Sequence, residues 1–210
     1  MESPVTIGLL LAAGTGRRLG RGPKALLPWH GRTLLAHQCA TLRAVLDDVL
    51  VVLGAGAEQA RPLLPPGCRA VLNDAWAAGL AGSLQRGVAA IGPNVDVVVI
   101  ALVDQPGMSA GAISRLLAVH RTGRVTVPTY GDGRRWGHPQ VWDRRLLGVA
   151  AAGAEGDEGA RRWLRAHPER IDQVPVPGDG EDLDTPEDWR RISGAWPPRS
   201  GPAGTADRPA

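Results

Sequence analysis

The residues with the clearest chemical potential form a loop after the first apolar run, residues 7–11. The loop combines glycines with cationic side chains: Gly14, Gly16, Gly20, Gly22, Arg17, Arg18, Arg21 and Lys24. Because glycine has no Cβ, the backbone N–H groups of such a loop can approach a phosphate group closely. Guanidinium and ammonium groups beside them would neutralise the phosphate charge. This combination predicts a binding site for a polyphosphate.

Two common phosphate-binding loops do not match this segment. A Walker A loop requires a Gly-Lys pair followed by Ser or Thr, which is absent here. The run Gly14-Thr15-Gly16 could begin a dinucleotide fingerprint, but the third glycine of that fingerprint would fall at Leu19. A dinucleotide site is therefore disfavoured, and the remaining alternative is a surface spacer without a ligand.

A carboxylate, Asp104, follows the most β-like run of the sequence, residues 95–103. A continuous apolar run is typical of a strand buried on both faces, so Asp104 is expected at the sheet edge where ligands bind. Hard divalent cations such as Mg²⁺ bind carboxylates together with phosphate oxygens. Asp104 is therefore a candidate metal ligand, and the alternative is an aspartate that only begins a turn before Pro106.

Two further aspartates, Asp182 and Asp184, stand near the C-terminal end. In an extended chain, side chains two residues apart point to the same side, so these carboxylates could share a cation. The segment also fits a helix start, with Thr185 as N-cap and Pro186 in the first turn. The two interpretations are compatible, and which aspartate would contact a metal stays open.

A polar segment at Asn73 follows another predicted strand. The Asn73 amide can donate and accept hydrogen bonds, so it could contact a base or a ribose. Residues from Gly79 to Ser83 would direct a helix N-terminus at an anion. The alternative is a plain loop followed by a helix that Ser83 caps.

The glycine-rich loop resembles the signature of the small nucleotidyltransferases that activate the molybdenum cofactor. The matching positions are Leu11, Ala12, Ala13, Gly14, Arg18, Gly20, Lys24, Leu26, Leu27 and Pro28. Similar motifs follow in the family's order: residues 73–87, Asp104-Gln105-Pro106, Gly137-His138-Pro139, residues 156–161 and residues 182–188. The alanine at position 13 resembles the cytidylyltransferase branch of the family, whereas the guanylyltransferase branch has a glycine at this position.

This resemblance implies transfer of CMP from CTP to the terminal phosphate of a molybdopterin-type cofactor, with release of pyrophosphate. It implies that Lys24 and Arg18 hold the triphosphate and that Asp104, with Asp184 or Asp182, binds Mg²⁺. It further implies acceptor contacts by His138 and Gln105. The positions implied to contact the nucleotide are Leu11, Ala12, Ala13, Gly14, Thr15, Gly16, Arg18, Lys24, Asn73, Gly79 and Ser83.

Three other functions stay open. One is transfer to another phosphorylated metabolite, such as a sugar phosphate. Another is an NAD(P)H-dependent oxidoreductase that reuses the scaffold, because relatives of the family are described as acting on a quinone-like dye. The third is a carrier that delivers the cofactor to a molybdoenzyme partner, in which the aspartates would have no function.

The elements that would position these residues alternate between strand and helix. Apolar runs predict strands over residues 5–12, 48–53, 69–72 and 95–103, and helical spacing predicts helices over residues 33–45, 57–64, 83–91 and 110–120. This alternation predicts an α/β fold with a doubly wound, mostly parallel, Rossmann-like sheet. Short strands over residues 124–128, 139–142 and 171–177, with helices over 158–167 and 186–192, predict a small mixed β element in the C-terminal half.

Length and composition indicate one globular domain. The 210 residues have 43% hydrophobic residues and a net charge of +3, which suits one α/β domain over residues 1–194 with a disordered tail over 195–210. The sequence contains no block of Lys and Arg of the kind that would predict nucleic-acid binding. The apolar runs fall short of the roughly 18 residues needed to span a bilayer, and no signal peptide is evident. Cys39 and Cys68 are interpreted as reduced thiols, and the protein is expected in the cytoplasm.

Overall fold

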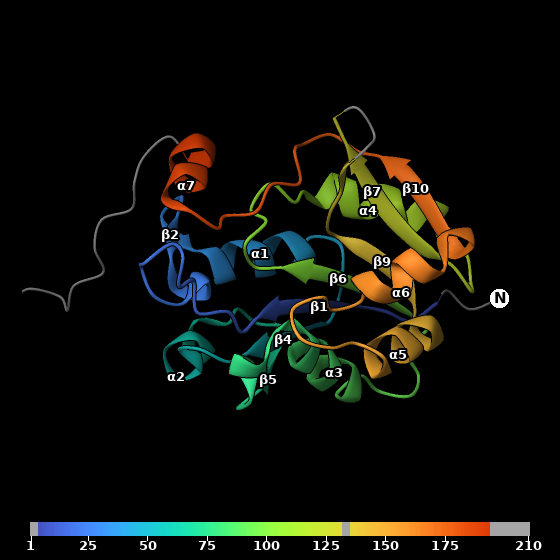
Figure 1. Ribbon diagram of the computed structural model, residues 1–210, viewed down its shortest axis with the longest axis horizontal. Helices are drawn as coiled ribbons and strands as arrows, with labels where there is room; N and C mark the ends of the chain where they lie inside the picture. The colour runs from blue at the N-terminus through green and yellow to red at the C-terminus, as the bar shows by residue number, and fades with distance from the viewer. Residues whose placement is uncertain (1–3, 132–134, 194–210) are drawn as a thin grey trace, which may run out of the picture.

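The computed structural model describes residues 4–131 and 135–193 of the chain. Its centre is an eight-stranded sheet in the order β10-β7-β9-β6-β1-β4-β5, with β8 paired to β7 (Figure 1). The strands are β1 Thr6–Ala12, β4 Val49–Leu53, β5 Cys68–Leu72, β6 Val97–Leu102, β7 Val125–Tyr130, β8 Arg135–Trp136, β9 Gln140–Asp143 and β10 Ile171–Pro175.

Most neighbouring strands run parallel. Strand β1 pairs in parallel with both β6 and β4, β4 with β5, and β7 with β10. Strand β9 is antiparallel to both β6 and β7, and β8 is antiparallel to β7. The doubly wound, mostly parallel α/β sheet is therefore confirmed, together with the mixed β element in the C-terminal half.

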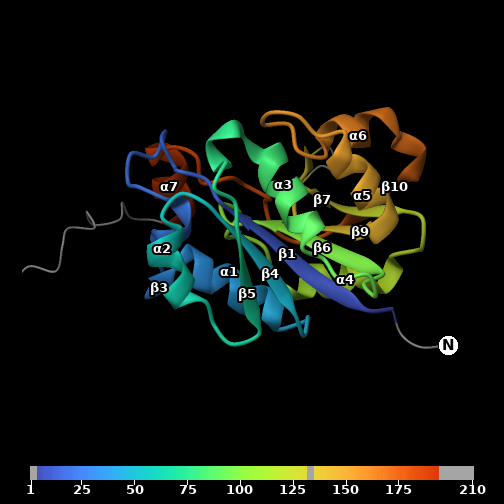
Figure 2. The ribbon, with the colours of Figure 1, turned by 90° about the horizontal axis from the view of Figure 1, so that it is seen from below.

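Helices cover both faces of the sheet (Figure 2). One face packs against α1 (Leu34–Arg43), α2 (Ala57–Ala60) and α4 (Ala110–Val119), and the other against α3 (Leu80–Ala89), α5 (Arg144–Ala152) and α6 (Arg161–Ala166). Short 3₁₀ turns connect some elements: η1 Lys24–Leu26, η2 Arg61–Leu63, η3 Trp76–Ala78 and η4 Pro168–Arg170.

The last helix, α7 (Pro186–Ser193), returns to the N-terminal part of the chain. It lies beside the small hairpin formed by β2 (Pro28–Trp29) and β3 (Arg32–Thr33). The rings of Trp29 and Trp189 meet edge to face with centroids 5.6 Å apart. This contact holds the C-terminal acidic segment next to the glycine-rich loop.

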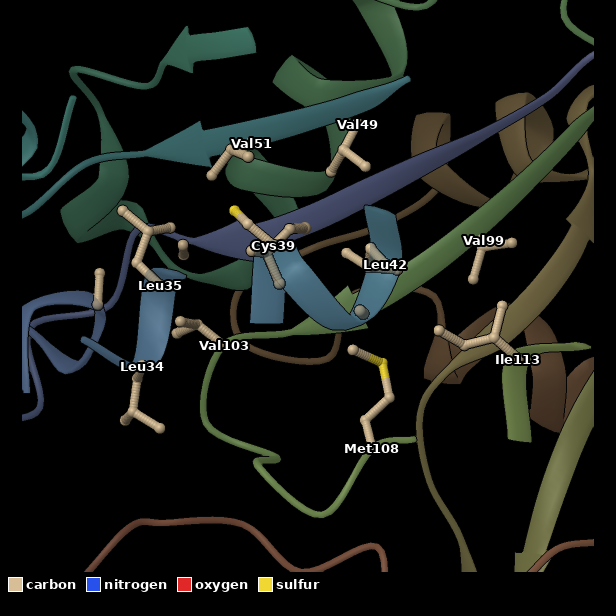
Figure 3. Packing of buried hydrophobic residues seen from close by; sticks show 14 of the residues in the cluster. Leu34, Leu35, Cys39, Leu42, Val49, Val51, Val99, Val103, Met108 and Ile113 are labelled. Carbon is tan, nitrogen blue, oxygen red and sulfur yellow. The ribbon is translucent and has the colours of Figure 1, made fainter. Parts of the chain in front are cut away.

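The apolar faces of the helices pack against the sheet. Cys39 and Leu42 of α1 point toward the strand that carries Val49 and Val51, and all four side chains are fully buried (Figure 3). A residue of this size contributes about 1.5–3 kcal/mol when it is fully buried. Thr33 caps α1, because its hydroxyl accepts the N–H of Ala36 at 3.1 Å, as the sequence predicted.

Strands β1 and β6 end at the same edge of the sheet, since they are parallel neighbours in register. Leu11 of β1 pairs with Leu102 of β6, and the next pair of groups is joined by a hydrogen bond from the Val103 N–H to the Leu11 carbonyl. The glycine-rich loop and Asp104 therefore leave the sheet side by side. None of the helices in residues 4–131 and 135–193 is long and apolar enough to cross a bilayer.

Two local predictions were wrong, and one helix was not predicted. Helix α3 begins at Leu80 with Gly79 as N-cap, so Ser83 lies within the helix and does not cap it. Helix α5 was not predicted, although Asp143 accepts the N–H groups of Arg145 and Leu146 as an N-cap. The helix expected over residues 158–167 is shorter and begins at Arg161. The predicted tail, residues 195–210, lies outside the described residues.

Candidate active site

The centre of the site is the ammonium group of Lys24, which lies between two carboxylates. Its Nζ is 2.6 Å from Oδ2 of Asp104 and 2.6 Å from Oδ1 of Asp184. The other oxygen of Asp184, Oδ2, accepts a hydrogen bond from Nη2 of Arg18 at 2.8 Å. Asp104 and Asp184, which are 80 and 160 positions from Lys24 in the sequence, thus meet it at the carboxyl ends of β1 and β6. The structure brings four of the sequence-predicted residues together here.

The backbone around Gly16 brings Lys24 to this position. Gly16 has φ of +65°, and its carbonyl accepts the N–H groups of Leu19 and Gly20, so the loop turns back on itself. A Cβ at Gly16 would lie 2.6 Å from the Gly22 carbonyl oxygen and 3.2 Å from Cγ of Lys24. A glycine is therefore required, and the stem of Lys24 runs directly past the loop.

Burial and neighbouring charges shift the pKa values of two residues in the site. Burial alone would lower the pKa of Lys24, but the attraction and hydrogen bonds of Asp104, followed by those of Asp184, outweigh it and raise this pKa above its usual value. The pKa of Asp182 is raised, chiefly by burial and also by the negative charges of Asp104 and Asp184. Lys24 therefore stays charged at neutral pH, as a phosphate-binding lysine requires.

Gln105 joins three loops of the site. Its Nε2 donates to Oδ1 of Asp182 at 2.6 Å, and its Oε1 accepts the N–H of His138 at 3.0 Å. The side chain is buried, and both polar ends of its amide are already used. These two contacts connect Gln105 to its neighbours in the site, and an acceptor contact would use the remaining N–H or lone pair of the amide.

A glutamine that the sequence analysis missed holds Gln105 in turn. Gln38 of α1 is fully buried, and its Nε2 donates to the carbonyls of Gln105 at 2.6 Å and Leu102 at 3.1 Å. These two carbonyls flank Asp104, whose own carbonyl accepts the N–H of Leu183 at 2.8 Å. The backbone on both sides of Asp104 is thereby fixed, and the acidic C-terminal segment is bound to it.

The aspartates of the C-terminal segment have different partners. Asp184 faces Lys24 and Arg18, whereas Asp182 faces Gln105. The following helix starts as predicted, because the Thr185 hydroxyl accepts the Asp188 N–H at 3.2 Å and Asp188 accepts the Thr185 N–H at 2.9 Å. This geometry favours Asp184 over Asp182 as the partner of Asp104.

His138 lies at one side of the site with its backbone fully held. Its carbonyl accepts the Tyr130 hydroxyl at 2.6 Å, and its peptide bond to Pro139 is cis. Burial, followed by the positive charge of Arg161, lowers the pKa of His138 to about 3, so the imidazole is neutral. Among the described residues its Nδ1 is buried without a partner, beside a cavity of about 40 Å³ that Leu11, Leu102 and Arg161 also line.

The predicted nucleotide contacts divide into exposed and buried positions. Gly14 and Arg18 are exposed and Thr15 is half-buried, while Gly16 is buried within the loop. The Ala12 side chain lies in the hydrophobic core, and Ala13 is buried beside Gly54, where a Cβ would lie 2.8 Å from Cβ of Ala13. Only the backbone of residues 12 and 13 is therefore placed to face a ligand.

Asn73 and Ser83 contact one another. The Asn73 amide donates to the Ser83 hydroxyl at 3.0 Å, and both residues are buried. The first N–H groups of α3 also have acceptors, because Ala81 donates to the Gly156 carbonyl at 2.9 Å and Leu80 to Asp157 at 3.4 Å. The segment of residues 156–161, whose role the sequence left open, thus closes the start of α3 and leaves little room for an anion there.

The acidic residues suit a divalent cation, although no cluster of three or more His, Cys, Asp or Glu side chains arranged for a metal occurs within residues 4–131 and 135–193. One oxygen of Asp104 and one of Asp184 lie equally close to the Lys24 nitrogen, so they are at most twice 2.6 Å apart. A cation already sits between them in the form of the ammonium group. Carboxylate oxygens, completed by phosphate oxygens and water, match the ligand set of Mg²⁺ or Mn²⁺.

Comparison with known proteins places this geometry in a family. Residues 8–171, which include the glycine-rich loop and Asp104, match the model of the MobA-like NTP transferase domain. The chain belongs to the MobA-like NTP transferase family. The predicted resemblance to molybdenum cofactor nucleotidyltransferases is confirmed at the level of this family.

Curated relatives of this MobA-like chain have different activities. It is 42% identical over 201 residues to nicotine blue oxidoreductase of Paenarthrobacter nicotinovorans, which covers 91% of this chain and 98% of the relative. It is 34% identical over 181 residues to 2-C-methyl-D-erythritol 4-phosphate cytidylyltransferase of Deinococcus radiodurans, 76% and 74% of the two chains. It is 36% identical over 123 residues to molybdenum cofactor guanylyltransferase of Xanthomonas euvesicatoria, 56% of each chain.

Solved structures agree with the MobA-like fold. The crystal structure of the Rv0371c homologue from Mycobacterium sp. strain JC1 matches with a TM-score of 0.79 and 33% identity over 90% of this chain and 95% of that chain. The complex of Rv0371c from Mycobacterium tuberculosis with manganese matches with a TM-score of 0.76 and 29% identity over 90% and 98%. The α/β nucleotidyltransferase fold extends over nearly the whole chain.

Proposed function

We propose that this protein transfers CMP from CTP to the terminal phosphate of a molybdopterin-type cofactor and releases pyrophosphate. One observation carries the proposal: the ammonium of Lys24, the guanidinium of Arg18 and the carboxylates of Asp104 and Asp184 meet beside a glycine-rich loop. Nucleotidyl transfer requires cations for a triphosphate and carboxylates for a divalent ion at one place. Membership of the MobA-like NTP transferase family supports the same reaction class.

The reaction needs positioning more than covalent chemistry from the protein. An oxygen of the acceptor phosphate attacks the α-phosphorus of the triphosphate, the bond to the β-phosphate oxygen breaks, and pyrophosphate leaves. The acceptor phosphate is already an anion near neutral pH, so no general base is required. Lys24, Arg18 and the exposed backbone at Gly14 would hold the triphosphate, and the fixed loop at Asp104 would keep the carboxylate in place.

Asp104 and Asp184 would hold the divalent cation, with Mg²⁺ as the proposed ion. When bound, such a cation neutralises charge on the phosphates and on the departing pyrophosphate. The manganese complex of the mycobacterial relative Rv0371c supports a divalent ion for this site. Asp182 is assigned a positioning role through Gln105 and not direct coordination.

Separate observations support the choice of donor and of acceptor. Ala13 supports CTP over GTP, because the resemblance associates alanine at this position with cytidylyl transfer. The cytidylyltransferase and guanylyltransferase relatives support a nucleoside triphosphate donor in general. The neutral imidazole of His138, whose Nδ1 has no partner among the described residues, supports an acceptor substrate that forms a hydrogen bond with Nδ1 beside Arg161. A sugar phosphate, or delivery of the product to a molybdoenzyme, fits the same site.

A second candidate function is NAD(P)H-dependent oxidation and reduction. The 42% identity with nicotine blue oxidoreductase, over nearly the whole of both chains, favours it. The pairing of Lys24 with Asp104 and Asp184 disfavours it, because a hydride-transfer enzyme has no evident use for this arrangement. Oxidation of NADPH by the purified protein, followed at 340 nm with a quinone-type dye, distinguishes the two.

The test is a measurement of pyrophosphate release with Mg²⁺ and each of the four nucleoside triphosphates, with molybdopterin cofactor or a set of sugar phosphates as acceptor. Release with CTP and molybdopterin cofactor, lost in Asp104→Asn, would support the proposal. Release only with GTP or only with a sugar phosphate would replace the donor or the acceptor. Absence of release with every pair, together with NADPH oxidation, would favour the second candidate.

A further inference from the structure

Each of the two carboxylates that would bind a divalent cation contacts at least one of the protein's own cations. Asp104 contacts Lys24, and Asp184 contacts Lys24 with one oxygen and Arg18 with the other. The side chains of Lys24, Asp104 and Asp184 are 11%, 21% and 28% exposed, whereas Arg18 is 72% exposed. The Lys24 contacts are therefore shielded from solvent, and the Arg18 contact is at the surface.

Lys24 occupies the space that a bridging metal ion would need. Mg²⁺ binds carboxylate oxygens at about 2.0–2.1 Å, so an ion that bridged Oδ2 of Asp104 and Oδ1 of Asp184 would lie between the two oxygens that now contact Nζ. An ammonium group and a divalent cation cannot share that position, because they repel one another and their ligands are the same. Arg18 does not create this conflict, since it approaches Asp184 from its other oxygen.

Charge leads to the same conclusion. The two cations and two carboxylates of the cluster sum to zero formal charge. A divalent cation added alone would give this partly buried cluster a charge of +2, whereas a cation that enters with a triphosphate brings its own counter-charge. The stem of Lys24 passes Gly16, so the side chain adjoins the glycine-rich loop as well as the carboxylates.

We infer that Lys24 closes the divalent-cation site of the nucleotide-free protein, and that cation and nucleoside triphosphate therefore bind together and not in sequence. The inference rests on the proposed function in one respect, the assignment of Asp104 and Asp184 as metal ligands. Phosphate oxygens take over the ammonium, and the carboxylates become available at the same time. Lys24 thus has two partners in the reaction cycle, carboxylates before binding and phosphates after it.

The test is titration of Mn²⁺, followed by electron paramagnetic resonance, with no turnover in the readout. In the wild type we expect weak binding of Mn²⁺ alone. With CTP present, and after subtraction of the Mn²⁺ that CTP binds in a matched sample without protein, we expect binding at least about tenfold tighter, a coupling within the usual range for linked sites. In Lys24→Met the carboxylates lose their ammonium, so Mn²⁺ alone should bind at least about tenfold more tightly than to the wild type. Asp184→Asn in the Lys24→Met background should remove this gain.

Arg18→Met is the matched control. It removes the same unit of positive charge from the cluster but leaves the Lys24 ammonium between the carboxylates. We expect it to change Mn²⁺ affinity without nucleotide by less than about threefold, as a solvent-screened charge should. Lys24→Gln, with a circular dichroism melting curve for each variant, repeats the measurement if Lys24→Met is poorly folded.

The outcomes separate this inference from the proposed function. Equal gains in Arg18→Met and Lys24→Met would overturn the inference, since charge and not occupancy would then decide. Tight binding of Mn²⁺ to the wild type without nucleotide would also overturn it. CTP-dependent Mn²⁺ binding in the wild type with no gain in Lys24→Met would overturn the role of Lys24 and leave the proposed metal site standing. No Mn²⁺ binding in any protein, even with CTP, would overturn both.

Discussion

Replacing Gln105 by methionine tests whether a single amide holds the site loops together. Methionine keeps the length and approximate volume of the side chain but has no N–H donor and no carbonyl acceptor. Asp182 would lose a donor at 2.6 Å, and the N–H of His138 would lose an acceptor at 3.0 Å. Gln105 is only 4% exposed, so water has little access to replace it.

The expected loss of stability follows from these two contacts. An unsatisfied buried N–H costs about 1–3 kcal/mol, and a hydrogen bond to a charged group contributes about 1.5–3 kcal/mol. Asp182 is half-buried and can regain some hydration, so the lower part of each range applies. We expect Gln105→Met to lower the free energy of unfolding by about 3 kcal/mol. For a chain of this length, that lowers the melting temperature by about 6–12 °C.

Urea unfolding followed by circular dichroism measures this change, with Gln105→Glu as the comparison. A glutamate keeps the acceptor for His138 but places a second carboxylate against Asp182, so it should destabilise the protein at pH 7. Burial and the negative charge of Asp182 should raise the pKa of this glutamate, so that it is protonated at pH 5 and can donate a hydrogen bond to Asp182. Part of the lost stability should then return relative to wild type. A loss below about 1 kcal/mol for Gln105→Met, or the same pH response in both variants, would refute the reasoning.

Three further predictions concern other contacts. Lys24→Met should reduce the rate of nucleotidyl transfer by at least about 10²-fold, because transition-state charge on the phosphates loses its ammonium, and steady-state pyrophosphate release measures this; near-normal turnover would contradict the assignment. His138→Gln should flatten the pH dependence of stability: with the folded-state pKa of His138 lowered to about 3, the unfolded chain binds the extra proton, so wild-type stability falls as pH decreases below about 6.5. The free energy of unfolding of the wild type should fall by up to about 1.4 kcal/mol per pH unit relative to the variant. Urea unfolding at pH 7 and pH 5 measures this, and the same change in free energy in both proteins would contradict the prediction. Gly54→Ala should lower the melting temperature, since its Cβ would lie 2.5 Å from Cβ of Trp76 and 2.8 Å from Cβ of Ala13, an overpacking that costs about 1–3 kcal/mol; an unchanged melting temperature would show that Trp76 yields freely.

The parts of the fold that the sequence predicted are those set by local pattern. Continuous apolar runs at residues 7–11 and 95–103 are long enough to indicate buried parallel strands, and the residues after them then meet at one sheet edge. Thr33 as a helix cap is also a local signal. The glycine-rich loop and Asp104 were therefore found without any knowledge of long-range contacts.

The parts that the sequence did not reveal depend on partners far along the chain. Helix α3 begins before Ser83 because Gly156 and Asp157 accept its first N–H groups, and no local pattern shows this. Gln38 is an ordinary helix residue by sequence, and only the carbonyls of the Asp104 loop give it a role. The choice between Asp182 and Asp184 likewise required the positions of Lys24 and Gln105.

Transfer of labelled nucleotide tests the central claim most directly. The protein would be incubated with Mg²⁺, molybdopterin cofactor and CTP that carries radioactive phosphorus at either the α or the γ position. The account predicts that α-label enters the acceptor in the same amount as pyrophosphate is released, that γ-label stays in pyrophosphate, and that Lys24→Met abolishes both. Label in the acceptor from the γ position, or no transfer from any nucleoside triphosphate to any phosphorylated acceptor, would contradict it.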